Sequence, residues 1–273
     1  MKSKHSRGVV PAAKVFVLVV LGSIAALASS ERNAEFLRTT AAVASSSLPV
    51  GTILPVRLDK TLSLEEARAG QVIEAIVMQD VPLPNREKIR MRSRVRGTIL
   101  SVGKAGEGNG IQLSMQFNEI EYDKQTIPIL TSLRAMASFQ AVRAAQMSFT
   151  GADAGTPAGW ATTVQIGGDT RFGDGGEVRN LQKQKVGKGV IGGVLVYVRA
   201  NPGAGCEGPE KGEDRLQALW VFSSDACGTY DFRGVQIVHQ GRTKPKGAIT
   251  LQFEKPDMKL EGATAMLLRV VVP

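Results

Sequence analysis

The chain has 273 residues, of which 43% are hydrophobic and 22% are charged, with 30 Gly, 12 Pro and two Cys. This composition is typical of a globular protein and excludes a disordered, collagen-like or disulfide-dense chain. The one long apolar run lies near the N-terminal end, which excludes a multi-pass membrane protein, and the length suffices for one large domain or two modest ones.

Residues 1–28 have the pattern of a secretory signal peptide. Four basic residues precede the apolar stretch Val15–Ala26, and the small-residue triplet Ala26–Ala28 follows it. The stretch is shorter than the roughly 20 residues of a membrane span. We expect cleavage after Ala28 and export to the periplasm or the medium, with an uncleaved anchor as the alternative. Cleavage lowers the net charge from +9 to +5, so a nucleic-acid partner is not expected.

The segment that follows is predicted to be a flexible leader, residues 29–48, and then a β module, residues 49–131. The leader shows no sustained period, whereas the module has short apolar–polar alternations that are typical of half-buried strands. The glycine-rich segment Gly106–Gly110 predicts a β-hairpin over Val95–Phe117. The predicted strands are Thr52–Leu58, Val72–Gln79, Val95–Val102, Ile111–Phe117, Ile120–Tyr122 and Thr126–Leu130.

Residues 132–159 are predicted to be a short helix and a linker between two modules. Apolar residues recur at helical spacing over Ser132–Gln146, and Gly151–Gly159 is rich in Gly, Ala and Pro. Strand-like alternation resumes in residues 160–273. The predicted strands there are Ala161–Ile166, Gly193–Arg199, Gln217–Phe222, Val235–His239, Ala248–Phe253 and Ala265–Val272. The expected fold is therefore mainly β, with a barrel-like or sandwich first module and an antiparallel second module.

The only two cysteines, Cys206 and Cys227, are predicted to form a disulfide in the second module. An even pair in an exported chain is usually oxidised, and a loop of this size stabilises a fold by about 3 kcal/mol on the chain-entropy account. A catalytic thiol is the alternative, for which His239 would have to act as the base.

A run of alternating basic residues begins at Arg86 and contains Lys88, Arg90, Arg92, Arg94 and Arg96. On one continuous strand, the period of two would place these cations on one face. One interpretation is a docking surface for an envelope glycan or an anionic lipid. The other is a solvated edge strand that its charge keeps soluble.

Three aromatic residues, Trp160, Trp220 and Tyr230, are candidates for a platform that binds a sugar or a peptide. The alternative is that they belong to the core. Trp220 alternates with Phe222, so the two side chains are expected to share one face of a strand.

No cofactor, metal site or catalytic set is predicted. The glycine-rich segment Gly167–Glu177 carries three acids, but their spacing does not fit a calcium loop, and a turn is expected. Ser223, Ser224 and Asp225 are the best candidates for a hydrolytic set, but they lack the G-x-S-x-G pattern of a nucleophile elbow.

The pattern of Val50–Pro128 resembles the β-barrel module of TrbI-type scaffold proteins of conjugation and type IV secretion. The resemblance rests on the segments Gly51–Pro55, Asp80-Val81, Lys88-Ile89, Arg94–Gly97 and Asp123–Pro128, with Gly70 and Ala75 between them. It implies a barrel. It also implies a turn inside the basic run, where the family usually has Pro or Gly and this chain has Arg90-Met91-Arg92. The whole chain looks like a group of exported bacterial proteins without an assigned activity.

These observations lead us to expect a non-enzymatic exported envelope protein that binds a glycan, a lipid or a protein partner. The first alternative is a subunit of an envelope-spanning secretion-type assembly, which would form homo-oligomers through the first module. The second alternative is a secreted hydrolase.

Overall fold

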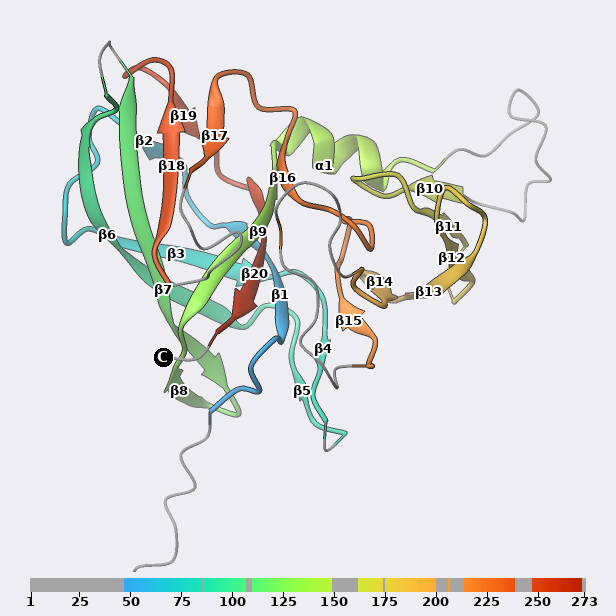
Figure 1. Cartoon of the computed structure of the whole chain (residues 1–273). Coiled ribbons are helices and arrows are strands. Elements are labelled where there is room, and N and C mark those ends of the chain that lie inside the picture. The colour runs from blue at the N-terminus through green and yellow to red at the C-terminus, as the bar shows by residue number, and fades with distance from the viewer. Residues whose placement is uncertain are drawn as a thin grey trace, which may run out of the picture. The chain divides into compact units, whose positions relative to one another are not determined.

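The computed structural model describes residues 47–84, 86–106, 110–148, 162–173, 175–199, 206, 214–238 and 247–271. The expected signal peptide, its cleavage site at Ala28 and most of the expected leader lie outside these residues. Within them the fold is mainly β, as predicted, with one short helix (Figure 1). The strands form one large sheet, a six-stranded sheet and two two-stranded sheets.

The large sheet has the strand order β16-β9-β20-β1-β3-β6-β7-β18-β17, with β8 paired to β7, and it curls into a nearly closed barrel (Figure 1). Its two end strands lie close to each other. The hydroxyl of Thr229 in β16 donates to the carbonyl of Val235 in β17 at 3.4 Å. All pairs in this sheet are antiparallel except β16 with β9. The strands are β1 (Ile53–Leu58), β3 (Val72–Val77), β6 (Arg94–Lys104), β7 (Ile111–Tyr122), β8 (Gln125–Pro128), β9 (Thr131–Ala137), β16 (Gly228–Tyr230), β17 (Val235–Ile237), β18 (Ile249–Phe253) and β20 (Ala265–Val270).

Alternation along the strands fills the barrel interior. In β7, Leu113, Met115 and Phe117 are fully buried while the residues between them are more exposed, as a period of two requires. The predicted hairpin is confirmed, since β6 and β7 pair from Val95 with Ile120 to Lys104 with Ile111. The predicted strands Ile111–Phe117 and Ile120–Tyr122, of which the second lies beyond the predicted hairpin, form one continuous strand.

Strands β9 and β20 are buried on both faces and separate two hydrophobic cores. In β20, Met266 and Leu268 belong to the barrel core, while Ala265 and Leu267 belong to a second core on the outside of the barrel. The helix predicted over Ser132–Gln146 is therefore wrong in its first half, which is β9. A strand covered on both faces loses its alternation and is not distinguishable from a buried helix by period. Helix α1 covers only Phe139–Gln146.

The second core lies between the barrel wall, α1 and the six-stranded sheet. Val194 and Val196 of this sheet pack there with Leu267 of the barrel and Val142 of α1. The sheet is an antiparallel meander of β10 (Thr162–Val164), β11 (Thr170–Phe172), β12 (Glu177–Arg179), β13 (Lys185–Val190), β14 (Gly193–Val196) and β15 (Gln217–Ala218). Because β16, β17, β18 and β20 join the barrel, sheet membership does not follow the boundary expected at residues 132–159.

Two short pairs complete the described fold. Strand β2 (Leu62–Ser63) pairs with β19 (Lys259–Leu260), and β4 (Val81–Pro82) pairs with β5 (Lys88–Ile89). The strand predicted over Gln217–Phe222 ends at residue 218, and a turn with Trp220 at φ +52° follows. Trp220 and Phe222 therefore do not alternate along one strand.

Candidate functional site

The basic run is divided between two strands and the turn that joins them. Lys88 lies in β5, residues 90–93 form the turn, and Arg94 begins β6. The amide of Ser93 donates to the carbonyl of Arg90 at 3.2 Å, which closes the turn. The cations therefore do not share the face of one strand. The edge-strand interpretation does not hold for β6 either, because β6 lies between β3 and β7.

Carboxylates offset the charge of three of the five candidate cations. Lys88 forms an ion pair with Asp80, and Arg94 pairs with Glu74 at 3.5 Å. Arg96 contacts Glu74 at 3.1 Å and also Glu121 at 3.7 Å. Exposed pairs of this kind contribute little stability, but they cancel the local positive charge.

The remaining two cations, Arg90 and Arg92, lie exposed on the turn and form no ion pair with any residue that the structure describes. Arg92 has φ +74°, a left-handed conformation in which Gly is the favoured residue. The amide of Arg92 is nevertheless held, because it donates to the carbonyl of Val77 at 2.8 Å. The excess positive charge is therefore concentrated on a backbone-anchored turn.

Asp80 anchors this turn from the connection between β3 and β4. Its Oδ1 accepts the amide of Met91 at 2.8 Å, and its Oδ2 accepts from the ammonium of Lys88. Partial burial acts to raise the pKa of Asp80, but the two hydrogen bonds and the charges of Lys88 and Arg90 outweigh it and lower that pKa. Asp80 is thus ionised at neutral pH and keeps Met91 between the two arginines in place.

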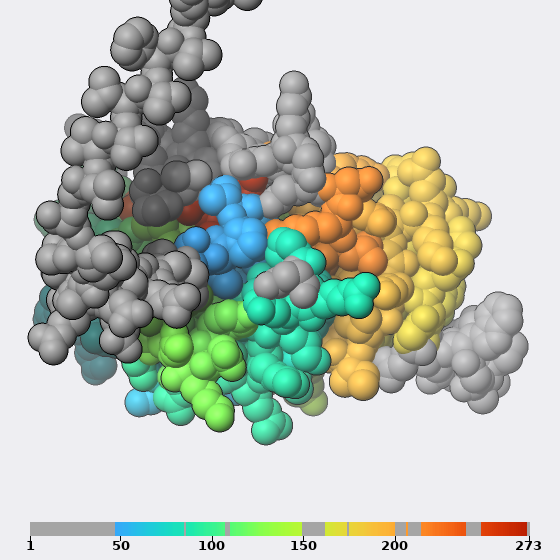
Figure 2. Space-filling model, turned by 90° about the horizontal axis from the view of Figure 1, so that it is seen from below, coloured from blue at the N-terminus to red at the C-terminus, as the bar shows by residue number. Residues whose placement is uncertain are grey.

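A second turn lies beside the basic one. Ile191 and Gly192 join β13 to β14, and Ile191 is 90% exposed. A side-chain carbon placed on Gly192 would lie 3.6 Å from the sulfur of Met91, so the two turns lie close together. Residues 90–93 and 190–193 are called the paired turns below. Figure 2 shows the turquoise surface around β5 beside the golden surface of β13 and β14.

Gln79, the residue before Asp80, fixes the second turn. Its side chain is fully buried; its Nε2 donates to the carbonyl of Val194 at 2.8 Å, and its Oε1 accepts the amide of Trp220 at 2.6 Å. Gly193 allows this approach, because a side-chain carbon there would lie 2.5 Å from the Cα of Trp220. Two consecutive residues therefore hold the two turns together. The sequence analysis did not identify Gln79 or Ile191. The one signal in the sequence was the segment Ile-Gly-Gly after β13, which is typical of a turn.

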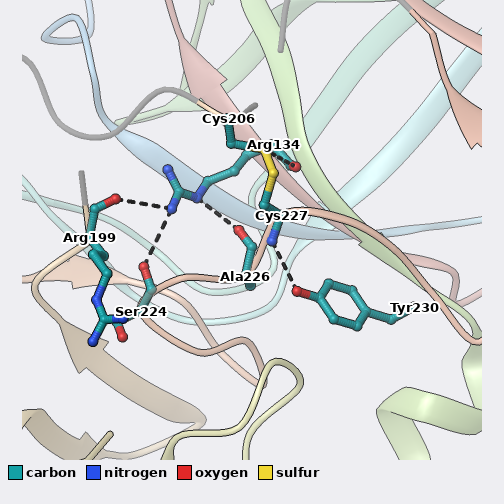
Figure 3. The surroundings of a disulfide bond; sticks show 7 residues. All are labelled: Arg134, Arg199, Cys206, Ser224, Ala226, Cys227 and Tyr230. Atoms are coloured by element: carbon teal, nitrogen blue, oxygen red, sulfur yellow. Dashed lines mark hydrogen bonds between the residues drawn. A yellow bond between two sulfur atoms is a disulfide. The ribbon is translucent and has the colours of Figure 1, made fainter. Parts of the chain in front are cut away.

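The predicted disulfide between Cys206 and Cys227 is present, with the two Cα atoms 6.0 Å apart (Figure 3). The guanidinium of Arg134 lies next to it and donates to the carbonyls of Ala226 at 3.0 Å, Arg199 at 3.3 Å and Ser224 at 3.4 Å. Burial and the nearby charge of Arg269 lower the pKa of Arg134 to about 10. The arrangement clamps the segment before β16 onto β9.

Two of the three aromatic candidates lie in or against the second core. Trp220 is only 4% exposed. Tyr230 is half-buried, its hydroxyl accepts the amide of Cys227 at 3.0 Å, and its ring meets Phe222 edge-on with the centroids 6.5 Å apart. Trp160 lies outside the described residues. Trp220 and Tyr230 therefore support the core interpretation.

The serines of the hydrolase interpretation are buried and engaged by carboxylates. The hydroxyl of Ser223 donates to Asp225 at 3.1 Å, and Asp169 accepts both the amide of Ser224 at 2.6 Å and its hydroxyl at 3.3 Å. Burial raises the pKa of Asp169, against the effect of these hydrogen bonds. His239 lies outside the described residues. In the part of the chain that the structure describes, no three His, Cys, Asp or Glu side chains gather as a metal site would require.

None of the helices in the described ranges combines the length and the hydropathy needed to cross a bilayer. No protein-family model matches this chain, and no curated protein sequence does so either.

Proposed function

We propose that this protein is a non-enzymatic exported protein of the cell envelope that binds an anionic partner through the turn at residues 90–93. The observation that carries the proposal is the contrast along the basic run. Lys88, Arg94 and Arg96 form salt bridges, whereas Arg90 and Arg92 lie exposed on an anchored turn and form none with the described residues.

The chemistry of the turn favours phosphate, sulfate or carboxylate groups as the ligand. A guanidinium presents a planar set of donors that matches such anions in a bidentate way. Because Asp80 holds the amide of Met91 and Val77 holds the amide of Arg92, little backbone freedom is lost on binding. The binding is expected to weaken as the salt concentration rises, since the two side chains are exposed.

Export and the absence of catalysis belong to the same proposal. The N-terminal pattern supports export, and the disulfide is consistent with an oxidising compartment. The burial of Ser223 and Ser224, and the carboxylates that their hydroxyls contact, support a binding role over a hydrolytic one.

Retention of the protein on an immobilised sulfated polysaccharide tests the proposal. The double variant R90E/R92E is expected to elute at much lower salt than the unmodified protein. The matched control is K104E/K255E, which makes the same change of charge at two exposed lysines outside the turn. Equal loss of retention in both variants would show that only net charge matters, and would refute a binding role for the turn.

A further inference from the structure

The paired turns combine charge with an exposed apolar tip. Ile191 is the most exposed large hydrophobic residue in the described part of the chain, at 90%, and Met91 beside it is 40% exposed. A single exposed apolar side chain is common on protein surfaces and needs no explanation. Here Met91 lies between Arg90 and Arg92 in the chain, and Ile191 precedes Gly192, which lies close to the sulfur of Met91. Apolar and cationic side chains therefore belong to one pair of neighbouring turns, which is a chemical combination that few ligands match.

We propose that the anionic partner is the surface of a phospholipid bilayer, with Ile191 and Met91 inserted among the lipids and the two arginines on the headgroup phosphates. This inference rests on the proposed function, because it names the chemical class of the partner of the same turn. Apolar residues at the acyl boundary with cations at the headgroup level are the arrangement of interfacial membrane contacts.

The placement of the two turns fits a bilayer better than a soluble glycan. Met91 follows Arg90 and precedes Arg92, so each cation flanks an apolar side chain, and Gly192, the residue after Ile191, lies close to Met91. A soluble polyanion satisfies the arginines but offers no apolar phase to Ile191. A bilayer satisfies both, because its headgroups and its hydrocarbon are a few ångströms apart.

The paired turns are also held rigidly enough to insert as a unit. Asp80 holds Met91, and the neighbouring Gln79 holds Val194 and Trp220 behind the second turn. No segment has to fold on binding, so the contact costs little conformational entropy. With one apolar tip and two cations, the expected binding is weak, reversible and sensitive to salt.

The test is co-sedimentation of the full mature protein with vesicles of phosphatidylglycerol and phosphatidylcholine. Ile191→Ser is expected to lower vesicle binding by about tenfold and to leave retention on the sulfated polysaccharide unchanged. Leu181→Ser, at an apolar residue that is 73% exposed elsewhere, is the matched control and is expected to bind vesicles normally. R90E/R92E is expected to lose both interactions.

A second measurement reports insertion directly. Ile191→Trp is expected to shift its fluorescence to shorter wavelength with these vesicles but not with the polysaccharide, and Leu181→Trp is expected to shift with neither. If the unmodified protein binds the polysaccharide but not the vesicles, the lipid inference fails and the proposed function stands. If it binds neither, both fail. If only protein-containing envelope fractions retain it, in an Ile191-dependent way, the partner is a protein and the lipid inference is overturned.

Discussion

Arg92 adopts a backbone conformation that does not suit its side chain. At φ +74° any residue with a Cβ atom is strained by roughly 1–2 kcal/mol, and Gly is not. The turn would therefore be more stable with a residue that cannot bind an anion. The arginine at this position is consistent with a binding role that works against stability.

The first prediction follows from this conflict. Arg92→Gly is expected to raise the free energy of unfolding by about 1 kcal/mol and to weaken retention on the sulfated polysaccharide. Denaturant titration, with the midpoint compared at constant slope, measures the first effect. Arg90→Gly is the matched control, because it removes a cation from the same turn at a residue without positive φ and should not stabilise the fold. Stabilisation of both variants to the same extent would argue against backbone strain.

The ionisation of Asp169 is expected to lower the stability of the fold, whereas most acidic side chains stabilise a fold when they are ionised. Its raised pKa means that the folded protein holds this proton more tightly than the unfolded chain does. The ionised carboxylate therefore costs stability at neutral pH, and this cost disappears as the pH falls through the folded pKa towards the ordinary value of the group. Burial is the main cause, and the charge of Asp225 adds to it.

The second prediction is that Asp169→Asn is more stable than the unmodified protein at pH 7, with a difference that shrinks as the pH is lowered. The amide oxygen would still accept the amide of Ser224, and the amide nitrogen would donate to its hydroxyl. Thermal unfolding at several pH values measures the difference. Asp257→Asn, at an exposed acid, is expected to show no such trend, and a constant difference for Asp169→Asn would contradict the argument.

At the scale of elements, Gln79 joins the barrel to the six-stranded sheet. It makes hydrogen bonds to residues 115 and 141 positions away, from a fully buried side chain. If the side chain is removed, the buried amide of Trp220 loses its acceptor, whereas the carbonyl of Val194 keeps the amide of Leu219 at 3.1 Å. A buried group left without a partner costs about 1–3 kcal/mol.

The third prediction is that Gln79→Ala lowers the free energy of unfolding by about 1–3 kcal/mol and also weakens vesicle binding, because the second of the paired turns loses its anchor. Gln236→Ala, at an exposed position of β17, should change neither property. Unfolding in denaturant and vesicle co-sedimentation are the two measurements. If Gln79→Ala is as stable as the unmodified protein, Gln79 does not anchor the second of the paired turns.

The burial and the sequence separation of these elements explain which parts of the fold can be predicted from the sequence. The hairpin β6–β7 was predictable because both strands alternate and a glycine-rich segment separates them. Strand β9 was not, because its two buried faces hide the alternation, and β13 was not, because Gly187 and Gly189 interrupt its apolar pattern. The disulfide was predictable because the chain contains two cysteines and no others. The paired turns were not predictable. They lie 100 residues apart in the chain, and the contacts of Gln79 and Gly193 bring them together.

At the scale of the molecule, the disulfide and Arg134 act on the same segment. The bridge closes a loop of 21 residues and is expected to contribute about 3 kcal/mol. Arg134 occupies a β-bulge, because Leu267 and Leu268 pair with Ala135 and Leu133 on either side of it. The bulge turns its side chain towards Ala226, next to Cys227.

The fourth prediction concerns the coupling of these two features. Arg134→Met is expected to destabilise the oxidised protein by about 1–3 kcal/mol, because the buried carbonyl of Ala226 loses its donor, whereas that of Ser224 keeps the amide of Arg199 at 2.9 Å. In the Cys206→Ala/Cys227→Ala background the same change should cost less, since the segment is already loosened. A double-mutant cycle measures the coupling. Strict additivity would show that the bridge and the guanidinium stabilise separate parts.

The fifth prediction is that the barrel and the six-stranded sheet unfold together. Strands β1, β9 and β20 supply residues to both cores, so neither core survives the loss of these strands. Leu267→Ala, which truncates a fully buried side chain of the second core, is expected to cost about 2–5 kcal/mol. Native-state hydrogen exchange should show this loss equally in the amides of β3 and β14, because local stability follows cooperative units. If protection falls in β14 alone, the six-stranded sheet is an independent unit, and the paired turns would then join two units that are able to separate.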